Sequence, residues 1–155
     1  MIPVSAADVD GMRLALAEAE RARDEGEIPV GAIVMQGGAV IAAAHNETVA
    51  LGHPTAHAEF LAIHRALAEL DTDRLTDATL YVTLEPCAQC AGAIVLAKVG
   101  RVVFGAWDDK AGMAGSVYDI LRHPRLNHQA EVIGGVSAEA SGTLLAHFFR
   151  DRRGP

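Results

Sequence analysis

The sequence has few cysteines and few charged residues for its length, and each shortage excludes a class of protein. Only two cysteines occur among 155 residues, so a disulfide-stapled scaffold is excluded and a reducing compartment is favoured. No apolar run reaches the ~18 residues of a membrane helix, and the N-terminus lacks the pattern of a signal peptide. Apolar residues make up 50% of the chain and charged ones 21%, unlike in disordered proteins. We expect a single domain over residues 1–155, located in the cytoplasm, with no membrane partner.

Charge is unevenly distributed along the chain. The formal net charge is −7, and this sign argues against a nucleic-acid partner because phosphates repel an acidic protein. Positive charges nevertheless exceed negative ones by two in residues 98–128, and by two again in residues 147–155. This excess indicates either a basic face for phosphates or only a balance of charge that keeps the protein soluble.

Hydrophobic patterning predicts helices and strands that alternate after an initial hairpin. Helices are expected over residues 8–25, 54–70, 85–98 and 137–150, with one more short helix that ends at Leu121. Strands are expected over residues 30–35, 39–44, 79–84, 101–105 and 131–133. This order is typical of an α/β sandwich built on a mixed sheet.

The two cysteines, Cys87 and Cys90, form a Cys-x-x-Cys motif that has three interpretations: a redox pair, part of a zinc site, or two small core residues. Redox pairs usually have aromatic or cationic neighbours, whereas alanine and glutamine flank these two. A structural zinc site needs four protein ligands, and no further cysteine is available. A catalytic zinc site needs only three protein ligands and a water, and His57 can be the third.

Charge and position support a catalytic zinc site at His57, Cys87 and Cys90. Two thiolates and a neutral imidazole cancel the charge of Zn²⁺, so a bound water can ionise near neutral pH. Both halves of the site lie at predicted helix N-termini, where backbone amides favour anions. Glu59 follows His57 by two residues, so both must lie in the irregular first turn, where the glutamate can bend toward the water.

A second His-x-Glu sequence, at His45 and Glu47, is a weaker candidate. It follows a predicted strand and lies in a loop, with no proline or threonine to begin a helix. The remaining histidines have no glutamate two residues later, and such isolated histidines are more often surface or hydrogen-bonded residues. His57 therefore remains the favoured ligand.

The two motifs and several flanking stretches resemble a known family. His57-Ala58-Glu59 followed by Pro86-Cys87-Ala88-Gln89-Cys90 is the pattern of the zinc nucleobase deaminases, whose glutamate moves protons and does not bind the metal. Over about residues 8–153 the chain is similar to the bacterial tRNA-specific adenosine deaminases. The similar stretches are residues 54–59, 83–87, 90–93, 101–106, 112–116, 126–128 and 148–150.

The resemblance implies a cytidine-deaminase-like fold, which is a three-layer α/β/α sandwich with a mixed five-stranded sheet. It implies a homodimer that binds one Zn²⁺ per chain through His57, Cys87 and Cys90. The implied substrate is the wobble adenosine in the anticodon arm of an arginine tRNA. In the implied reaction a zinc-bound hydroxide attacks C6, and Glu59 takes the proton of the water and returns it to the base.

The resemblance also implies substrate contacts. Asn46 would hydrogen-bond the purine, Val30 would pack on its ring, and Asp108 and Lys110 would lie along the RNA path. Neighbouring nucleotides would contact Phe148, Phe149, Arg150, Arg152 and Arg153. Core packing of the two phenylalanines and a solvated helix end for the arginines are the alternatives. Trp107 stands where many family members have a basic residue, so a phosphate contact is either lost or replaced by stacking on a base.

Two other functions compete with tRNA deamination. A deaminase of free guanine, cytosine or cytidine would use the same zinc chemistry and would need no basic face, which suits the acidic charge. A non-catalytic, zinc-stabilised interaction module is the other alternative. Glu59 argues against it, because a structural zinc site has no use for a carboxylate aimed at an open metal position.

Overall fold

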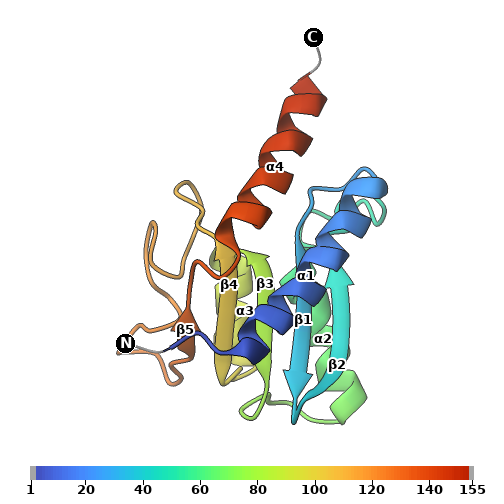
Figure 1. Ribbon diagram of the computed structural model, residues 1–155. Coiled ribbons are helices and arrows are strands. Elements are labelled where there is room, and N and C mark those ends of the chain that lie inside the picture. The colour runs from blue at the N-terminus through green and yellow to red at the C-terminus, as the bar shows by residue number, and fades with distance from the viewer. Residues whose placement is uncertain (1–2, 154–155) are drawn as a thin grey trace.

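A five-stranded sheet forms the centre of the computed structural model, which describes residues 3–153 (Figure 1). The strand order is β2-β1-β3-β4-β5. β1 pairs antiparallel with β2 and β3, whereas β3, β4 and β5 are parallel, so the sheet is mixed as predicted. The strands are β1 (Gly31–Gln36), β2 (Ala39–His45), β3 (Thr79–Leu84), β4 (Arg101–Ala106) and β5 (Glu131–Ile133).

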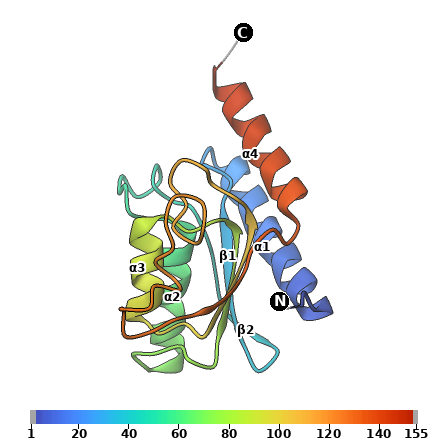
Figure 2. The same ribbon diagram turned by 90° about the vertical axis from the view of Figure 1, so that its left-hand side faces the viewer.

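Helices cover both faces of the sheet and complete the predicted three-layer sandwich. α1 and α4 lie on one face, and α2 and α3 pack together on the other, as Figure 2 shows from the side. The last helix, α4, extends beyond the sheet (Figure 1). The helices are α1 (Ala6–Asp24), α2 (Ala58–Leu70), α3 (Ala88–Leu96) and α4 (Ala138–Arg153).

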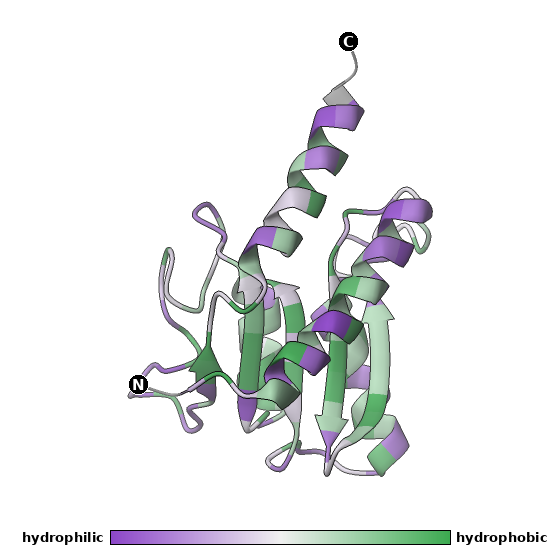
Figure 3. Cartoon of the chain, viewed as in Figure 1, coloured by the Kyte–Doolittle hydropathy of each residue, from purple (hydrophilic) through white to green (hydrophobic). Residues whose placement is uncertain are grey.

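Alternation along the strands divides the core between the two faces. In β3, Leu80 and Val82 are buried toward α2 and α3, whereas Tyr81 between them is buried toward α1. Hydrophobic residues follow the inner strands and the inner faces of the helices, and hydrophilic residues mark the outer ends of α1 and α4 (Figure 3). Among the described residues, no helix combines the length and apolarity needed to cross a membrane.

The segment before β5 differs from the sequence-based expectation. The short helix predicted to end at Leu121 is not formed, and the segment consists of turns with a single bridge between Ala114 and Asp119. The amides of the segment donate elsewhere, because the Val117 N–H donates to the carbonyl oxygen of Gly112 at 2.9 Å and the Ile120 N–H to that of Met113 at 2.8 Å. Neither acceptor lies four residues earlier in the chain, so these amides make no α-helical hydrogen bond.

Asp8 ties α1 to the sheet through a buried carboxylate. The Arg101 guanidinium donates to both of its oxygens, with Nη2 at 2.8 Å from Oδ2, and the Tyr81 hydroxyl donates at 3.2 Å. Asp8 also closes a capping box with Ser5 at the start of α1. Hydrogen bonding to Arg101 holds the pKa of Asp8 well below its usual range. This one carboxylate therefore joins α1, β3 and β4.

We expect Asp8→Asn to lower the free energy of unfolding at pH 7 by about 2 kcal/mol, because Arg101 loses its buried counter-charge and keeps only the half-exposed Glu131, at 3.0 Å. The native pKa of Asp8 is depressed, so its contribution is present above about pH 4 and is lost as the pH falls further. Urea denaturation at neutral and acidic pH should show the difference from wild type shrinking with acid. Asp10→Asn, an exposed position on the same helix, is the control, and equal effects of both variants would contradict the prediction.

Candidate active site

The N-termini of two helices meet at one end of the sheet and supply the predicted metal-binding residues. His57 is the N-cap of α2 and Cys87 is the N-cap of α3, and neither side chain caps its own helix. Both side chains are therefore free to turn toward a shared ligand. The Gln89 amide joins the two ends, because it donates to the carbonyl oxygen of Thr55 at 2.9 Å. α2 begins four residues later than the sequence indicates, at Ala58.

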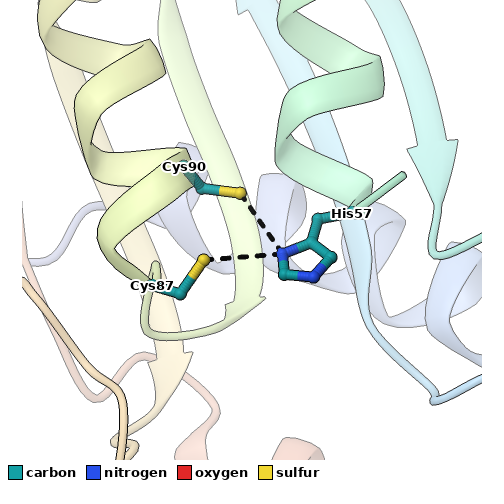
Figure 4. Close-up of side chains that lie close together, drawn as sticks. All are labelled: His57, Cys87 and Cys90. Atoms are coloured by element: carbon teal, nitrogen blue, oxygen red, sulfur yellow. Dashed lines mark hydrogen bonds between the residues drawn. The ribbon is translucent and has the colours of Figure 1, made fainter. Parts of the chain in front are cut away.

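His57, Cys87 and Cys90 converge on one point (Figure 4). The Nδ1 atom of His57 lies 3.5 Å from the Sγ atom of Cys87 and 3.5 Å from that of Cys90. Tetrahedral zinc with ordinary bond lengths separates a nitrogen and a sulfur ligand by about 3.6 Å. The donor set and its spacing therefore fit zinc, with three protein ligands and one open position.

The cysteine thiols are electrostatically coupled. Hydrogen bonding from Cys90, supported by His57, lowers the pKa of Cys87 to about 3. The same contact raises the pKa of Cys90, because the two sulfur atoms compete to carry one negative charge. A divalent cation would remove this competition, since it stabilises both thiolates at once. The pair is thus suited to a shared metal.

Glu59 lies in the first turn of α2, beside the donor cluster. Only 4% of its surface is exposed, and burial raises the pKa of its carboxyl to about 7. A carboxyl with such a pKa can accept and release a proton near neutral pH. The position in the first turn agrees with the sequence-based expectation that His57 and Glu59 face the same space.

A cavity of about 180 Å³ opens at the donor cluster. This volume is below the ~300–1,000 Å³ of typical sites for drug-sized ligands, so the cavity suits a ligand no larger than a single base. Its wall comes from the ends of β2, β3 and β4 and the starts of α2 and α3. The lining residues are Ile28, Val30, Asn46, His57, Ala58, Glu59, Leu84, Glu85, Cys87, Asp108 and Ala111.

Asn46 brings an unused hydrogen-bonding atom to the cavity wall. Its side chain is buried, and its Oδ1 has no hydrogen-bond partner among the described residues. The Nδ2 group makes only a long contact, 3.4 Å, to the Thr48 hydroxyl. A buried polar atom without a partner is costly in a folded protein, so Oδ1 is poised for a donor on a ligand.

Four of the predicted substrate contacts lie near the cavity or in the loop beside it. Val30 and Asn46 line the cavity, as does Asp108. The Asp108 carboxylate also accepts the backbone amides of Lys110 and Ala111, each at 3.1 Å, and so shapes the loop after β4. Lys110 is exposed on that loop and is not part of the cavity wall.

The predicted contacts on α4 lie outside the cavity. Phe148 and Phe149 meet edge to face with ring centroids 5.5 Å apart, and Phe149 is 43% exposed. Arg152 lies 4.7 Å above the Phe148 ring and donates to the carbonyl oxygen of Gly26 at the end of α1. Arg150 is exposed, and the side chain of Arg153 lies outside the described part of the chain.

The second His-x-Glu sequence has a structural role. His45 lies between two carboxylates, with Nδ1 at 3.0 Å from Glu18 and Nε2 at 2.6 Å from Glu25. Burial opposes protonation of His45, but the two glutamates outweigh it and raise its pKa. Glu47 pairs with Arg65 at 3.2 Å. These residues fasten β2 to α1 and to α2, and they are not among the converging metal donors.

Sequence reasoning did not assign a role to two buried glutamates that hold the loops around the cavity. Glu85 accepts the amides of Asp108, Ala114 and Ser116 and the Ser116 hydroxyl. On the opposite side, Glu27 accepts the amides of Val49 and Ala50 at 2.9 and 2.7 Å. The available signal was their position in the sequence, since Glu85 directly follows the apolar strand β3 and Glu27 lies four residues before β1, where a buried charge requires partners.

Comparison with known proteins identifies relatives of the whole domain. The MafB19-like deaminase family matches residues 7–153. The tRNA-specific adenosine deaminase of Bacillus subtilis (strain 168) is 49% identical over 142 residues, covering 92% of this chain and 88% of that protein.

Solved structures with the same fold extend the comparison. A structure described for A-to-I editing by tRNA:A34 deaminases at the wobble position matches with a TM-score of 0.84. It is 40% identical and covers 88% of this chain and 99% of the other. A guanine deaminase from Nitrosomonas europaea matches with a TM-score of 0.74 and 25% identity, covering 96% of this chain and 86% of the other. The predicted cytidine-deaminase-like fold is confirmed by these neighbours.

We expect Glu85→Gln to destabilise the protein by about 2 kcal/mol, because an amide has one acceptor oxygen and turns its NH₂ group toward backbone donors. Urea denaturation measures the change in the free energy of unfolding. Glu139→Gln, an exposed position on α4, is the matched control and should be neutral. If Glu85→Gln were as stable as this control, Glu85 would not anchor the loop after β4.

Proposed function

The chain belongs to the MafB19-like deaminase family and to the tRNA-specific adenosine deaminases, and from this we propose that it converts adenosine to inosine at the wobble position of a tRNA anticodon. The observation that carries the chemistry is the meeting of Glu59, the three metal donors and the unpartnered Asn46 at one base-sized cavity. The 49% identity to a tRNA-specific adenosine deaminase supports the substrate. An arginine tRNA and a cytoplasmic location, both expected from the sequence, are part of the proposal.

Zinc would be held by His57, Cys87 and Cys90, one ion per chain. When bound, zinc supplies a Lewis acid that polarises a water, so that the water loses a proton near neutral pH. Glu59 would accept the proton of the water that attacks C6 and return it to the base. The exocyclic amino group would then leave as ammonia, and adenosine plus water become inosine plus ammonia.

Recognition of the base would fall to the walls of the cavity. The unpartnered Oδ1 of Asn46 would accept a hydrogen bond from the purine, or the amide would donate after rotation. Val30, which is buried beside it, offers an apolar surface for the ring. Asp108 shapes the remaining wall through its two amide contacts. An anticodon loop presents an adenosine that can leave its stack at little cost.

Contacts with the rest of the anticodon arm would come from α4 and from the loop after β4. α4 projects past the sheet (Figure 1) and carries aromatic and cationic side chains at its outer end. Stacking on aromatics and ion pairs to phosphates are the two contacts by which proteins hold single-stranded RNA. The proposed contact residues are Lys110, Phe148, Phe149, Arg150, Arg152 and Arg153.

A free nucleobase is the second candidate substrate. The structural likeness to a guanine deaminase and the net charge of −7 favour it. The identity to that protein is 25%, against 49% to the tRNA-specific enzyme, so tRNA is the better supported substrate.

We also propose that the protein forms a homodimer through the outer face of α2 and α3. Leu96 is 81% exposed and Phe60 39% exposed, beside a groove of about 410 Å³. Contiguous exposed apolar surface of this kind is typical of contacts between proteins. Residues lining the groove include Phe60, Ile63, His64, Leu67, Ala93 and Leu96.

Inosine mapping on total tRNA incubated with the purified protein tests the function, beside assays on free adenosine, cytidine, cytosine and guanine. We expect inosine at the wobble position of an arginine tRNA. Deamination of free bases without tRNA editing would overturn the proposal in favour of the second candidate.

Two substitutions separate proton transfer from metal binding. Glu59→Gln should retain zinc and lose at least ~10²-fold in rate, because general acid–base help is removed. Cys87→Ala should lose most of the zinc, as measured by elemental analysis. Glu69→Gln, exposed on the same helix as Glu59, is the control and should keep both properties. A metal-free Glu59→Gln protein would make Glu59 a ligand instead.

The dimer is tested by Leu96→Glu, which places a charge at the centre of the proposed interface. Sedimentation velocity at micromolar concentration should give a dimer for wild type and a monomer for this variant, because a buried, unpaired charge opposes association. Val9→Glu, an exposed position on α1 at the opposite face, should remain dimeric. A monomeric wild type would contradict the proposal.

A further inference from the structure

Trp107 is a large aromatic side chain held at the surface, next to the cavity. It is the chain's only tryptophan, and 51% of its surface is exposed. It directly follows β4 and directly precedes Asp108, a residue of the cavity wall. Exposing a residue of this size forgoes much of the free energy that burial would provide, so its position calls for a binding role.

Close contacts with neighbouring residues hold the Trp107 indole in one position. Its ring meets Phe104 at 4.7 Å between centroids and at an angle of 87°. Gly134 permits this, because a Cβ atom there would come within 2.8 Å of the indole Cη2 atom. Gly115 and Gly135 also lie against the indole, since Cβ atoms there would be 3.5 Å from its Cζ3 and Nε1 atoms, and these contacts leave about half of the residue's surface exposed. The ring is therefore a rigid surface that loses little conformational entropy on binding.

The guanidinium of Arg122 lies close to Trp107, with Gly115 between the two side chains. A Cβ atom at Gly115 would lie 3.5 Å from Trp107 Cζ3 and 3.6 Å from Arg122 Nη2, so the two side chains flank this glycine. The Arg122 guanidinium is held by the carbonyl oxygen of Ala114 at 2.9 Å and by Asp119 at 2.6 Å. Arg122 is therefore already paired with a carboxylate and fixes the loop beside the indole, so stacking is the contact that this surface offers a base.

An exposed indole can assist base flipping, the movement of a nucleotide out of its stack. An adenosine that leaves its stack to enter the cavity deprives the adjoining base of a stacking partner. The exposed indole, which directly precedes the cavity-wall residue Asp108, can replace that partner, and this stabilises the flipped state over the stacked one. A free nucleobase in the cavity has no adjoining base and gains nothing from the indole.

Resting on the proposed tRNA substrate, we propose that Trp107 is the stacking surface for the nucleobase adjacent to the adenosine that enters the cavity.

The single tryptophan allows a direct test on the unaltered, zinc-loaded protein. Titration with the anticodon stem-loop should quench the Trp107 emission in a saturable manner and reduce its quenching by acrylamide several-fold. Free adenosine should leave the emission unchanged, because it brings no flanking base. Anisotropy of an end-labelled stem-loop follows binding independently of the tryptophan.

Substitutions at Trp107 measure the contribution of stacking. Trp107→Ala should weaken stem-loop binding about 5- to 150-fold, the range that loss of one stacked base produces. Trp107→Phe should recover a large part of the affinity. Neither substitution should change the salt dependence of binding, because no phosphate contact is removed. Zinc content and urea denaturation verify that both variants are folded.

The outcomes separate this inference from the proposed function. Saturated binding in the anisotropy assay with unchanged tryptophan emission would overturn the stacking role, while inosine formation in tRNA would still support the deaminase. Emission that depends on protein concentration alone would place Trp107 at a subunit contact and would also overturn it. Failure to edit or bind tRNA at all would instead contradict the proposed function.

Discussion

The meeting of two helix N-termini at the carboxyl end of β3 is the constraint on which the rest of the site depends. α2 and α3 pack side by side on one face of the sheet, and each begins at one of the converging donors, His57 or Cys87. The partial positive charges of both helix ends favour the thiolates and the carboxylate gathered there. Each residue adds about 100° of rotation and 1.5 Å of rise, so a shift of either helix by one residue would separate the donors.

Buried carboxylates and apolar side chains together hold the loops that complete the cavity. Glu85 binds the loop after β4, and Glu27 binds the loop after β2. The loop after β4 also buries Ala114 and Leu121 in the core, and its buried backbone amides need the hydrogen-bond partner that Glu85 provides. The carboxylates are fixed to the ends of the structured body, and the loops thus acquire defined positions. Asn46 and Asp108, which face the cavity, lie in these loops and depend on that attachment.

Local patterns were enough to predict that His57, Cys87, Cys90 and Glu59 come together at one cavity, because their spacing along the chain reflects two helix starts. The start of α2 was misplaced for an equally local reason, since Thr55 uses its hydroxyl on the ring of His53, at 2.7 Å, and does not cap a helix. The contacts of Glu85 span 23 to 31 residues, and that between Asp8 and Arg101 spans 93. No pattern within a short window contains such pairings, so neither the loop after β4 nor the anchoring of α1 was predictable.

Because the indole of Trp107 is uncharged, it affects how long an RNA stays bound and not how fast the RNA arrives. A guanidinium at this position would attract any polyanion from a distance, whereas an aromatic ring acts only after contact. With a net charge of −7, the protein provides weak long-range steering, so encounters with RNA are slow and indiscriminate ones are rare. Discrimination then lies in the dwell time, because only a loop with an unstacked base gains from the ring and remains bound. Duplex regions of the same tRNA, whose bases are already stacked, would dissociate quickly.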